Sequence, residues 1–379
     1  MTTMSDFRAE LHAWLDAHHD DLAPRYEPPG SLDEEIAQMQ RVKGILFDAG
    51  WMRYGWPERV GGLGGPPMMR TELGAALASR DLADPGHFSL IEVLAPTLVD
   101  FAPPALAADV VPRLLSGEEM WCQGFSEPGT GSDLASLSCR ARADGSAFVV
   151  NGQKVWTSLA QYSQRCVLLT RTGTLESRHR GITAFFVDMD TPGITVSPLE
   201  MINGVREFTE VFFDDVVVPA DRMLGPLDGG WAVAMSILPY ERSSCFWQRI
   251  AYLYRRLELL AALTPADDDR AAEAIGNAYV ALHTLRARSR ATQHRLAAGE
   301  TLGAETSIDK VLVASAEQAT YEAARRLLPA GLVETDDSAA AEAWRNELLY
   351  ARAATIYGGT AEVQRNIIAR RLLDLGGDD

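Results

Sequence analysis

Hydrophobic and polar positions follow a helical period in the first third of the chain. Leu11, Trp14 and Leu15 fall on one face of an expected helix, and residues 33–49 alternate charged and apolar positions at helical spacing. The glycine-rich stretch at residues 61–65 predicts a loop, because no strand precedes it as a dinucleotide-binding fingerprint would require.

The helical period returns after residue 229 and continues to the C-terminus. Two apolar faces are expected there, formed by Ile250, Leu253, Leu257 and Leu260, and by Ile275, Tyr279 and Leu282. The last third of the chain therefore reads as a helical bundle.

The middle of the chain, from about residue 121 to 224, has the pattern of strands. Strands are expected at 166–170, at 182–187 and at 210–218, where Pro219 closes the last one. The Asn151-Gly152 step between residues 147–150 and 153–156 predicts a hairpin with a type I′ turn, because these residues tolerate positive φ angles. We therefore expect an α+β fold in three parts: a helical domain at 1–120, a β domain at 121–224 and a helical-bundle domain at 225–379.

The charge balance narrows the choice of partners. The 379 residues include 52 acidic and 35 basic side chains, a formal net charge of −17. Such a surface repels phosphate backbones and anionic headgroups, so we expect neither nucleic acid nor membrane as a partner. An anionic ligand must then be held locally. The run Arg178-His179-Arg180 is a candidate for this, although such a run is more often a solvated loop.

The four cysteines indicate neither a disulfide framework nor a metal site. Cys122, Cys139, Cys166 and Cys245 are widely scattered, as buried thiols in a reducing compartment would be. The first ten residues lack the apolar run of a signal peptide, and no stretch of about 18 apolar residues could span a membrane. We expect a soluble, cytoplasmic protein without a bound metal.

Two segments of the β region could approach a flat or anionic ligand. Residues 125–133, Phe-Ser-Glu-Pro-Gly-Thr-Gly-Ser-Asp, offer backbone donors at glycines together with hydroxyl groups. Residues 151–158, Asn-Gly-Gln-Lys-Val-Trp-Thr-Ser, add an aromatic ring and further hydroxyls. Taken alone, a loop of the first kind is more often just a turn, and Trp156 could be a structural tryptophan.

Together the two segments resemble the flavin-binding segments of the acyl-CoA dehydrogenase family, T/S-E-P-x-x-G-S-D and N-G-x-K-x-W-I-T. Residues 356–368, Ile-Tyr-Gly-Gly-Thr-Ala-Glu-Val-Gln-Arg-Asn-Ile-Ile, resemble the third family signature. The resemblance covers nearly the whole chain. It implies FAD as the cofactor and an N-terminal helical domain, a β-barrel-like middle domain and a four-helix C-terminal domain.

The resemblance also implies which residues contact the cofactor. Phe125, Ser126, Gly131 and Ser132 would line the pyrimidine side of the flavin, Trp156 would lie against the ring system, Ser158 near N5 or O4, and Thr360 and Glu362 near the ribose and diphosphate. Donors beside N1 and O2 stabilise the negative charge of the reduced flavin. Serine at position 158 replaces the usual threonine and keeps its hydroxyl.

The base of the commonest family form is missing from its usual place. That form has a glutamate in its Tyr-x-Gly-Thr motif, where this chain has Gly358. A subset of the family places the base on an earlier helix, in a pattern resembling Leu-Pro-x-Glu-Arg, and residues 238–242 read Leu-Pro-Tyr-Glu-Arg. The resemblance therefore assigns Glu241 as the base and Arg242 as a neighbour that orders the site or the ligand. Spacing alone would favour an ordinary solvated helix residue at Glu241, and it is Pro239, Arg242 and the absent side chain at Gly358 together that favour the base.

The implied reaction is the α,β-dehydrogenation of an acyl-CoA thioester to the trans-2-enoyl-CoA. The base removes the α-proton and must be partly desolvated, while the β-hydrogen leaves as hydride to flavin N5. In relatives, a flavin ribityl hydroxyl and the backbone N–H at the position of Gly358 bind the substrate carbonyl. Ser132, Arg242 and Tyr357 are the expected substrate contacts, and an electron-transfer flavoprotein is the expected electron acceptor.

The chain departs from its homotetrameric relatives in the contacts made to a neighbour's flavin. It lacks their Arg-x-x-Phe-Gly motif, since Phe246 is its last phenylalanine, and residues 327–332 replace a Gly-Gly-x-Gly segment. This resembles subunits of heteromeric acyl-CoA dehydrogenases of bacterial steroid catabolism. Either a related chain completes a heterotetramer, or a homodimer holds FAD by other residues, for instance arginines of the run 286–295.

Other functions on the same fold remain open at this point. The chain could be a non-catalytic or half-site subunit, which the presence of Glu241 argues against. It could also be a flavin oxidase, a monooxygenase or an acyl-carrier-protein dehydrogenase. The acyl group, from a fatty acid or a steroid side chain, is not fixed by any of these motifs.

Overall fold

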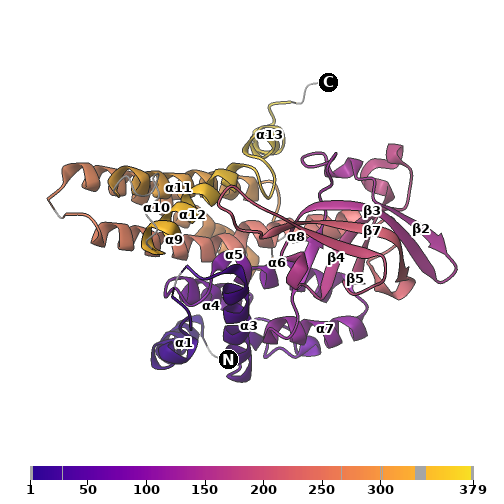
Figure 1. Ribbon diagram of the computed structural model, residues 1–379, viewed down its shortest axis with the longest axis horizontal. Coiled ribbons are helices and arrows are strands. Elements are labelled where there is room, and N and C mark those ends of the chain that lie inside the picture. The colour runs from indigo at the N-terminus through magenta and orange to yellow at the C-terminus, as the bar shows by residue number, and fades with distance from the viewer. Residues whose placement is uncertain are drawn as a thin grey trace. The chain divides into compact units, whose positions relative to one another are not determined.

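The computed structural model describes residues 3–27, 29–265, 267–298, 300, 302–328 and 339–376. Backbone contacts divide the chain into two compact units, coloured by residue number in Figure 1. The helical unit comprises residues 1–56, 64–89 and 239–379, and the β unit comprises residues 57–63 and 90–238. The N-terminal and C-terminal helices thus belong to one unit, although they lie at opposite ends of the sequence. The three domain boundaries expected from the sequence stay a prediction.

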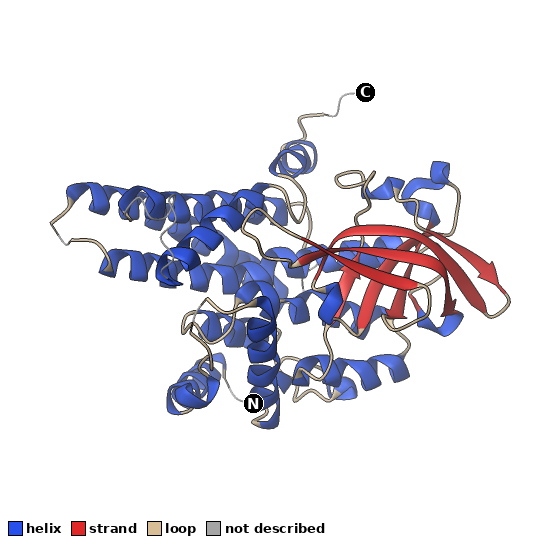
Figure 2. Ribbon diagram, viewed as in Figure 1, coloured by secondary structure: helices blue, strands red, loops and turns tan. Residues whose placement is uncertain are grey.

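The β unit is built on one bent sheet, drawn in red in Figure 2. Its strands are β1 (Trp121–Gly124), β2 (Arg140–Asp144), β3 (Ala147–Ser158), β4 (Arg165–Arg171), β5 (Ile182–Asp188), β6 (Ile194–Leu199), β7 (Phe208–Pro219) and β8 (Met223–Leu224). The order along the sheet is β6-β7-β3-β2-β4-β5-β8, and β1 pairs with β4 in parallel. The helices of this unit are α6 (Leu90–Phe101), α7 (Pro104–Ser116) and α8 (Gly230–Tyr240), whose last two residues belong to the helical unit.

Burial along the strands explains why the sequence predicted some of them. Strands β4 and β5 are buried at almost every position, which requires the continuous apolar runs seen at 166–170 and 182–187. Strand β7 alternates between buried and exposed residues along much of its length, as expected for a sheet with one solvated face. Short strands such as β1 and β8 were not predicted, because two to four residues carry no readable period.

The hairpin predicted at Asn151-Gly152 is wrong. Both residues lie inside the twelve-residue strand β3, and the turn that joins β2 to β3 is at Gly145-Ser146. The register against β7 shifts between Val150 and Gly152, and the Asn151 side chain bonds Asp215 across this irregularity. An Asn-Gly pair satisfies a β-bulge as well as a turn, since both need unusual backbone angles.

The helical unit contains all the other α-helices of the described residues. They are α1 (Met4–Ala17), α2 (His19–Leu22), α3 (Leu32–Asp48), α4 (Met68–Ala78), α5 (Pro85–Phe88), α9 (Phe246–Ala262), α10 (Asp269–Ala297), α11 (Thr306–Leu327), α12 (Ala339–Tyr350) and α13 (Ala361–Arg371). A π-helical turn, η7 (Glu241–Cys245), joins α8 to α9, and a 3₁₀ segment, η9 (Ala351–Thr355), precedes α13. Helices α9, α10 and α11 lie side by side (Figure 1).

The core of the helical bundle follows one of the two predicted faces. Ile250, Leu253, Leu257 and Leu260 of α9 are all buried, as expected. On α10, Leu282 is buried but Tyr279 is half exposed, so the second predicted face is wrong in part. The buried stripe of α10 runs through Ala278, Leu282 and Leu285. The expected face included the large Tyr279, whereas the structure buries the small Ala278 beside it, where helices can pack closely.

Among the described residues, no helix is long and apolar enough to cross a membrane. The longest helix, α10, has 29 residues but carries charged side chains along its length.

Candidate active site

Glu241 begins the π-helical turn η7, and its surroundings favour the neutral carboxyl. The side chain is half-buried. Burial raises the pKa of Glu241 above its ordinary value, and the positive charges of Arg242 and Lys310 act in the opposite direction. A single π turn widens a helix locally and is frequent at functional sites. A half-buried carboxylate with a raised pKa is suited to accept a proton.

Gly358 lies directly against Glu241, although 117 positions separate them in the sequence. A Cβ atom added to Gly358 would overlap Glu241 Oε1, so any larger residue would have to displace that carboxylate. Gly358 also has φ +61°, a left-handed conformation that glycine adopts at little cost. The structure therefore brings the expected base, Glu241, next to Gly358, whose N–H is expected to bind the substrate carbonyl.

Arg242 and Gln364 hold the backbone around Gly358. Arg242 is buried, and its Nη2 donates to the Gly358 carbonyl at 3.4 Å. The fully buried Gln364 donates from Nε2 to the carbonyl oxygens of Gly358 and Gly359, at 3.3 and 3.4 Å. These donors fix the two peptide groups that flank the Cα atom of Gly359. Sequence reasoning did not single out Gln364, although it lies within the third signature.

Lys310 of α11 is a further residue that sequence reasoning missed. Its side chain is only 1% exposed, and Nζ donates to the Ala354 carbonyl at 2.7 Å. The same Nζ lies 3.9 Å from the centre of the Tyr357 ring. Burial lowers the pKa of Lys310 to about 8, and burial raises that of Tyr357. We call Glu241, Arg242, Lys310, Tyr357 and Gly358 the carboxylate cluster.

Thr360 and Glu362, predicted near the FAD ribose and diphosphate, lie at the start of α13. The Thr360 hydroxyl accepts a hydrogen bond from the Val363 N–H at 3.2 Å and so caps the helix. Glu362 is exposed and lies 3.7 Å from Arg365, a surface ion pair. Thr360 lies two residues after Gly358 of the carboxylate cluster.

The flavin contacts expected from the β region gather around two segments of the β unit. We call Phe125, Ser126, Gly131, Ser132, Trp156 and Ser158 the Trp156 platform. Phe125 is buried, Ser126 and Ser158 are half-buried, and Gly131 and Ser132 are exposed. The two segments are joined where Val155 N–H donates to the Ser126 carbonyl at 2.9 Å.

A buried ion pair fixes the first of these segments. Lys154 is fully buried, and its Nζ lies 2.8 Å from Glu127 Oε1 and donates to the Phe125 carbonyl at 3.1 Å. Glu127 also accepts hydrogen bonds from the N–H groups of Ser138 and Cys139, at 2.7 and 2.9 Å. Lys154 therefore ties strand β3 to the loop that carries Ser126.

The Trp156 platform has features that fit a flat, polar cofactor. The Trp156 side chain is 62% exposed, and its φ of +60° is an uncommon conformation for a bulky residue. A Cβ atom at Gly131 would meet nothing within 4 Å, so the backbone there is open to a ligand. The hydroxyls of Thr130 and Thr157 are buried with no hydrogen-bond partner among the described residues. Residues of this kind can hold FAD.

In the run Arg178-His179-Arg180, the Arg178 side chain is held by contacts within the β unit. Arg178 pairs with Asp133 and donates to the Ser136 hydroxyl at 2.8 Å. Arg178 thus holds the loop that follows Ser132. A role of this run in binding CoA phosphates stays a prediction.

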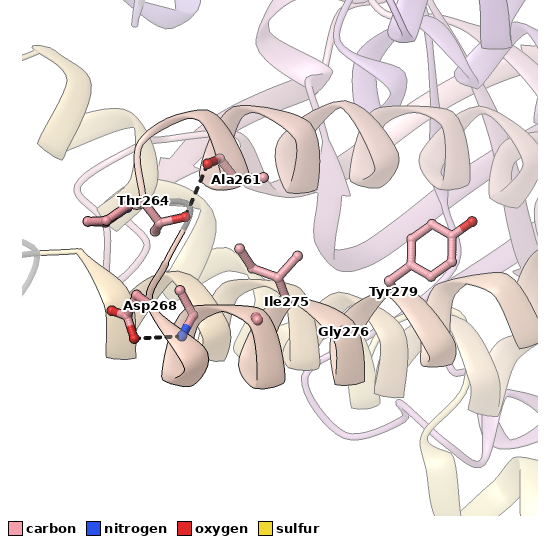
Figure 3. Close-up of a pocket in the computed structure, with 9 residues that line it drawn as sticks. Ala261, Thr264, Asp268, Ile275, Gly276 and Tyr279 are labelled. Carbon is pink, nitrogen blue, oxygen red and sulfur yellow. Dashed lines mark hydrogen bonds between the residues drawn. The ribbon is translucent and has the colours of Figure 1, made fainter.

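A pocket elsewhere in the helical unit contains none of the predicted site residues. It has a volume of about 400 Å³ and is shown in Figure 3. Its lining comes from the end of α9, the start of α10 and the loop joining them: Ala261, Thr264, Pro265, Asp268, Ala271, Ala272, Ile275, Gly276 and Tyr279. Ala261 lies roughly 30 Å along a nearly continuous helix from Glu241, at about 1.5 Å per residue.

The described residues contain no group of three or more side chains suited to a metal ion.

Comparisons with known proteins identify the family of this chain. Residues 122–216 match the family model of the acyl-CoA dehydrogenase middle domain, and residues 228–373 match that of the C-terminal domain. The chain is 37% identical to the acyl-CoA dehydrogenase IpdE1 of Mycobacterium tuberculosis over 385 residues, covering 99% of this chain and 98% of that protein. It is 34% identical to IpdE1 of Mycolicibacterium smegmatis over 396 residues, with coverage of 99% and 98%.

A solved structure, the Tcur3481-Tcur3483 steroid ACAD, superimposes with a TM-score of 0.85 and 25% identity, covering 99% of this chain and 98% of that chain. This chain therefore belongs to the acyl-CoA dehydrogenase family, whose members are FAD-dependent oxidoreductases that act on acyl-CoA thioesters. The family and the α+β fold predicted from the sequence are confirmed.

Proposed function

We propose that this chain catalyses the α,β-dehydrogenation of an acyl-CoA thioester to the trans-2-enoyl-CoA, with Glu241 as the base. The position of Glu241 against Gly358 carries the proposal. The commonest form of the family has its glutamate base at the position of Gly358. Here a carboxylate from another element occupies the space in which that side chain would begin.

The chemistry of the carboxylate cluster supports proton removal. The Glu241 carboxylate takes the α-proton, and the β-hydrogen leaves with the electron pair of its bond, so that a C=C bond forms. FAD, when bound, supplies the acceptor for that hydride. Burial strengthens Glu241 as a base because it raises the carboxyl pKa. Arg242 holds the Gly358 carbonyl, which lies on the other side of the Gly358 Cα from the N–H that is expected to bind the thioester oxygen, and thereby helps to fix the conformation of this residue.

We favour a related partner chain for the missing trans contacts, because two arginines of the run 286–295 are engaged within this chain. Arg286 lies 5.2 Å from the centre of the Tyr254 ring, and Arg295 pairs with Glu300 and Glu305. Arginines engaged in this way are less available for a diphosphate. The Tcur3481-Tcur3483 steroid ACAD is named for two chains. We therefore favour a heteromeric enzyme acting on a steroid-derived acyl-CoA, with an electron-transfer flavoprotein as acceptor.

Residues 329–332 of the segment that replaces Gly-Gly-x-Gly lie outside the described residues.

The decisive experiment compares the absorbance of the bound flavin before and after anaerobic addition of acyl-CoA thioesters, including steroid side-chain thioesters. We expect the oxidised flavin band to bleach, and Glu241→Gln to slow the bleaching by about 10²- to 10⁴-fold, the usual contribution of a general base. Glu258→Gln is the matched control, because Glu258 is an exposed glutamate on the adjoining helix α9. Its bleaching should equal that of the unmodified chain.

The partner proposal is tested by the flavin content of the chain purified alone and after co-expression with a related acyl-CoA dehydrogenase chain. A full complement of flavin per chain in the protein purified alone would exclude the need for a partner. If the flavin instead bleaches at the same rate in Glu241→Gln as in the unmodified chain, then Glu241 is not the base.

A further inference from the structure

All three lysines of this chain are buried, and each must therefore be explained. Lys43, Lys154 and Lys310 are exposed by 1%, 0% and 1%, so every other basic side chain counted in the charge balance is an arginine. Lysine is almost never fully buried without a partner, because removing an ammonium group from water is costly. Lys154 has its partner in Glu127, at 2.8 Å.

Lys310 has no such partner. Among the described residues, no carboxylate lies within ion-pair distance of its Nζ, which donates to the Ala354 carbonyl at 2.7 Å and faces the Tyr357 ring at 3.9 Å. Both contacts fall on the short segment that ends at Gly358. The ammonium group is therefore held near the centre of the carboxylate cluster without being neutralised directly.

Lys310 and Glu241 approach Gly358 together. A Cβ atom built on Gly358 would overlap Glu241 Oε1 and would lie 3.7 Å from Lys310 Cε. The lysine stem and the carboxylate thus flank the same backbone position. At this range a buried charge changes the free energy of ionising a carboxyl group appreciably, because the surrounding dielectric is low.

Other charges around Lys310 come from several elements. Glu241 and Arg242 of η7 and Glu317 of α11 all act on it electrostatically. Glu317 is paired with Arg249 of α9 at 3.0 Å, so much of its charge is already balanced. Of the two carboxylates that act on Lys310, Glu241 is the one that forms no ion pair with another described residue.

The residue next to Lys310 in the chain is directed elsewhere. Asp309 accepts a hydrogen bond from the Thr292 hydroxyl at 2.6 Å and lies 3.3 Å from Arg288, both on α10. It is therefore committed to the α10–α11 contact.

We infer that Lys310 is a positioning residue for the Glu241 base: it holds the segment from Ala354 to Gly358 against the carboxylate, and its charge favours the ionised carboxylate, against the effect of burial. The role of Glu241 as the base rests on the proposed function, whereas the coupling between the two side chains does not. Burial alone would push Glu241 toward its neutral form, which cannot accept a proton. A cation held by Ala354 and Tyr357 opposes this without covering the carboxylate oxygens.

The first test is the pH dependence of flavin reduction in Lys310→Met and Lys310→Arg. A base with a raised pKa loses activity as the pH falls through that pKa. Without the lysine charge the pKa of Glu241 rises further, so we expect the acid limb of Lys310→Met to move up by one pH unit or more. Lys310→Arg keeps the charge, and its limb should stay within about half a unit of the unmodified enzyme, even if its rate falls.

A purely structural role would lower the rate of Lys310→Met equally at every pH and leave its acid limb in place. That result would overturn the inference. Lys43→Met is the matched control, because it removes a buried lysine that lies over the Phe88 ring rather than at the carboxylate cluster. Its acid limb should not move.

The second test needs neither flavin nor turnover. Lysine labelled with ¹³C at Cε gives only three side-chain signals in the full chain, and the signal lost in Lys310→Arg identifies Lys310. Glu241 raises the pKa of Lys310, so the titration midpoint of Lys310 should fall in Glu241→Gln. An unchanged midpoint would overturn the coupling between Glu241 and Lys310. This test does not use Lys310→Met, so it remains decisive even if that variant does not fold. A lowered midpoint in a chain that oxidises no acyl-CoA would refute the proposed function alone.

Discussion

Two buried lysines in this chain hold backbone carbonyls in the same way but differ in what surrounds them. Lys154 donates to the Phe125 carbonyl at 3.1 Å in the β unit, and Lys310 donates to the Ala354 carbonyl at 2.7 Å in the helical unit. Lys154 has Glu127 at 2.8 Å, whereas Lys310 has no carboxylate within ion-pair distance among the described residues. One ammonium group is neutralised at contact, and the other acts over a longer distance.

The two glutamates respond in opposite directions. Burial by itself raises the pKa of Glu127, but Lys154 and the N–H groups of Ser138 and Cys139 lower it overall. No such set of donors surrounds Glu241 within the described part of the chain, so burial prevails and its pKa is raised. A buried carboxylate surrounded by donors is held as an anion and serves the structure. One with a cation near but not in contact keeps its oxygens available for a substrate proton.

The largest effect that would test this contrast is expected from Lys154→Met. It leaves Glu127 buried without its cation, and breaking a buried pair in this way costs about 3–5 kcal/mol. We expect urea denaturation to show a loss of this size in the free energy of unfolding. Lys154→Met combined with Glu127→Gln should recover part of it, because no uncompensated charge remains. A loss below about 1 kcal/mol for Lys154→Met alone would mean that the pair is not the main structural tie of this loop.

The sequence indicated most of the candidate site residues because they lie in contiguous motifs. The segments at 125–133, 151–158 and 356–368 could be read directly, and Glu241 followed from its flanking residues. The contact between Glu241 and Gly358 could not be read, because it depends on how two distant segments pack.

Two other features were out of reach for related reasons. Lys310 is a single lysine within a helical pattern, and nothing local to it indicates burial or a role. The Asn151-Gly152 step was misread because a bulge and a turn demand similar backbone angles, and only the neighbouring strand β7 decides between them.

The second-largest effect should come from Gly358→Ala, which tests whether Glu241 needs a residue without a side chain at position 358. The new Cβ would overlap Glu241 Oε1 and displace the carboxylate. A displacement of about 1 Å can cost about 10²-fold in rate, and we expect a loss of that order in the rate of flavin reduction.

Gly64→Ala is the matched control for Gly358→Ala. Gly64 has φ +72° and open space around it, so its substitution brings similar backbone strain without a clash. Its rate should be unchanged. Equal rates for Gly358→Ala and the unmodified enzyme would show that Glu241 tolerates a side chain at this position, and that the proposed base is not confined by Gly358.

The smallest effect is expected at Trp156, which is exposed, in contrast to the buried Lys154 of the same strand β3. The side chain is 62% exposed and contacts the Phe208 ring edge-on, with 6.1 Å between ring centres. Its removal in Trp156→Ala should change the free energy of unfolding by only about 0.5 kcal/mol, as is usual at surfaces. The affinity for FAD should fall by about 2- to 12-fold, the equivalent of a lost aromatic contact worth about 0.5–1.5 kcal/mol. Trp156→Phe keeps an aromatic face and should retain most of the affinity in an equilibrium FAD titration of the same preparation. If Trp156→Ala unfolds as easily as Lys154→Met yet binds FAD unchanged, then Trp156 is a structural residue and the platform must bind its cofactor through other groups.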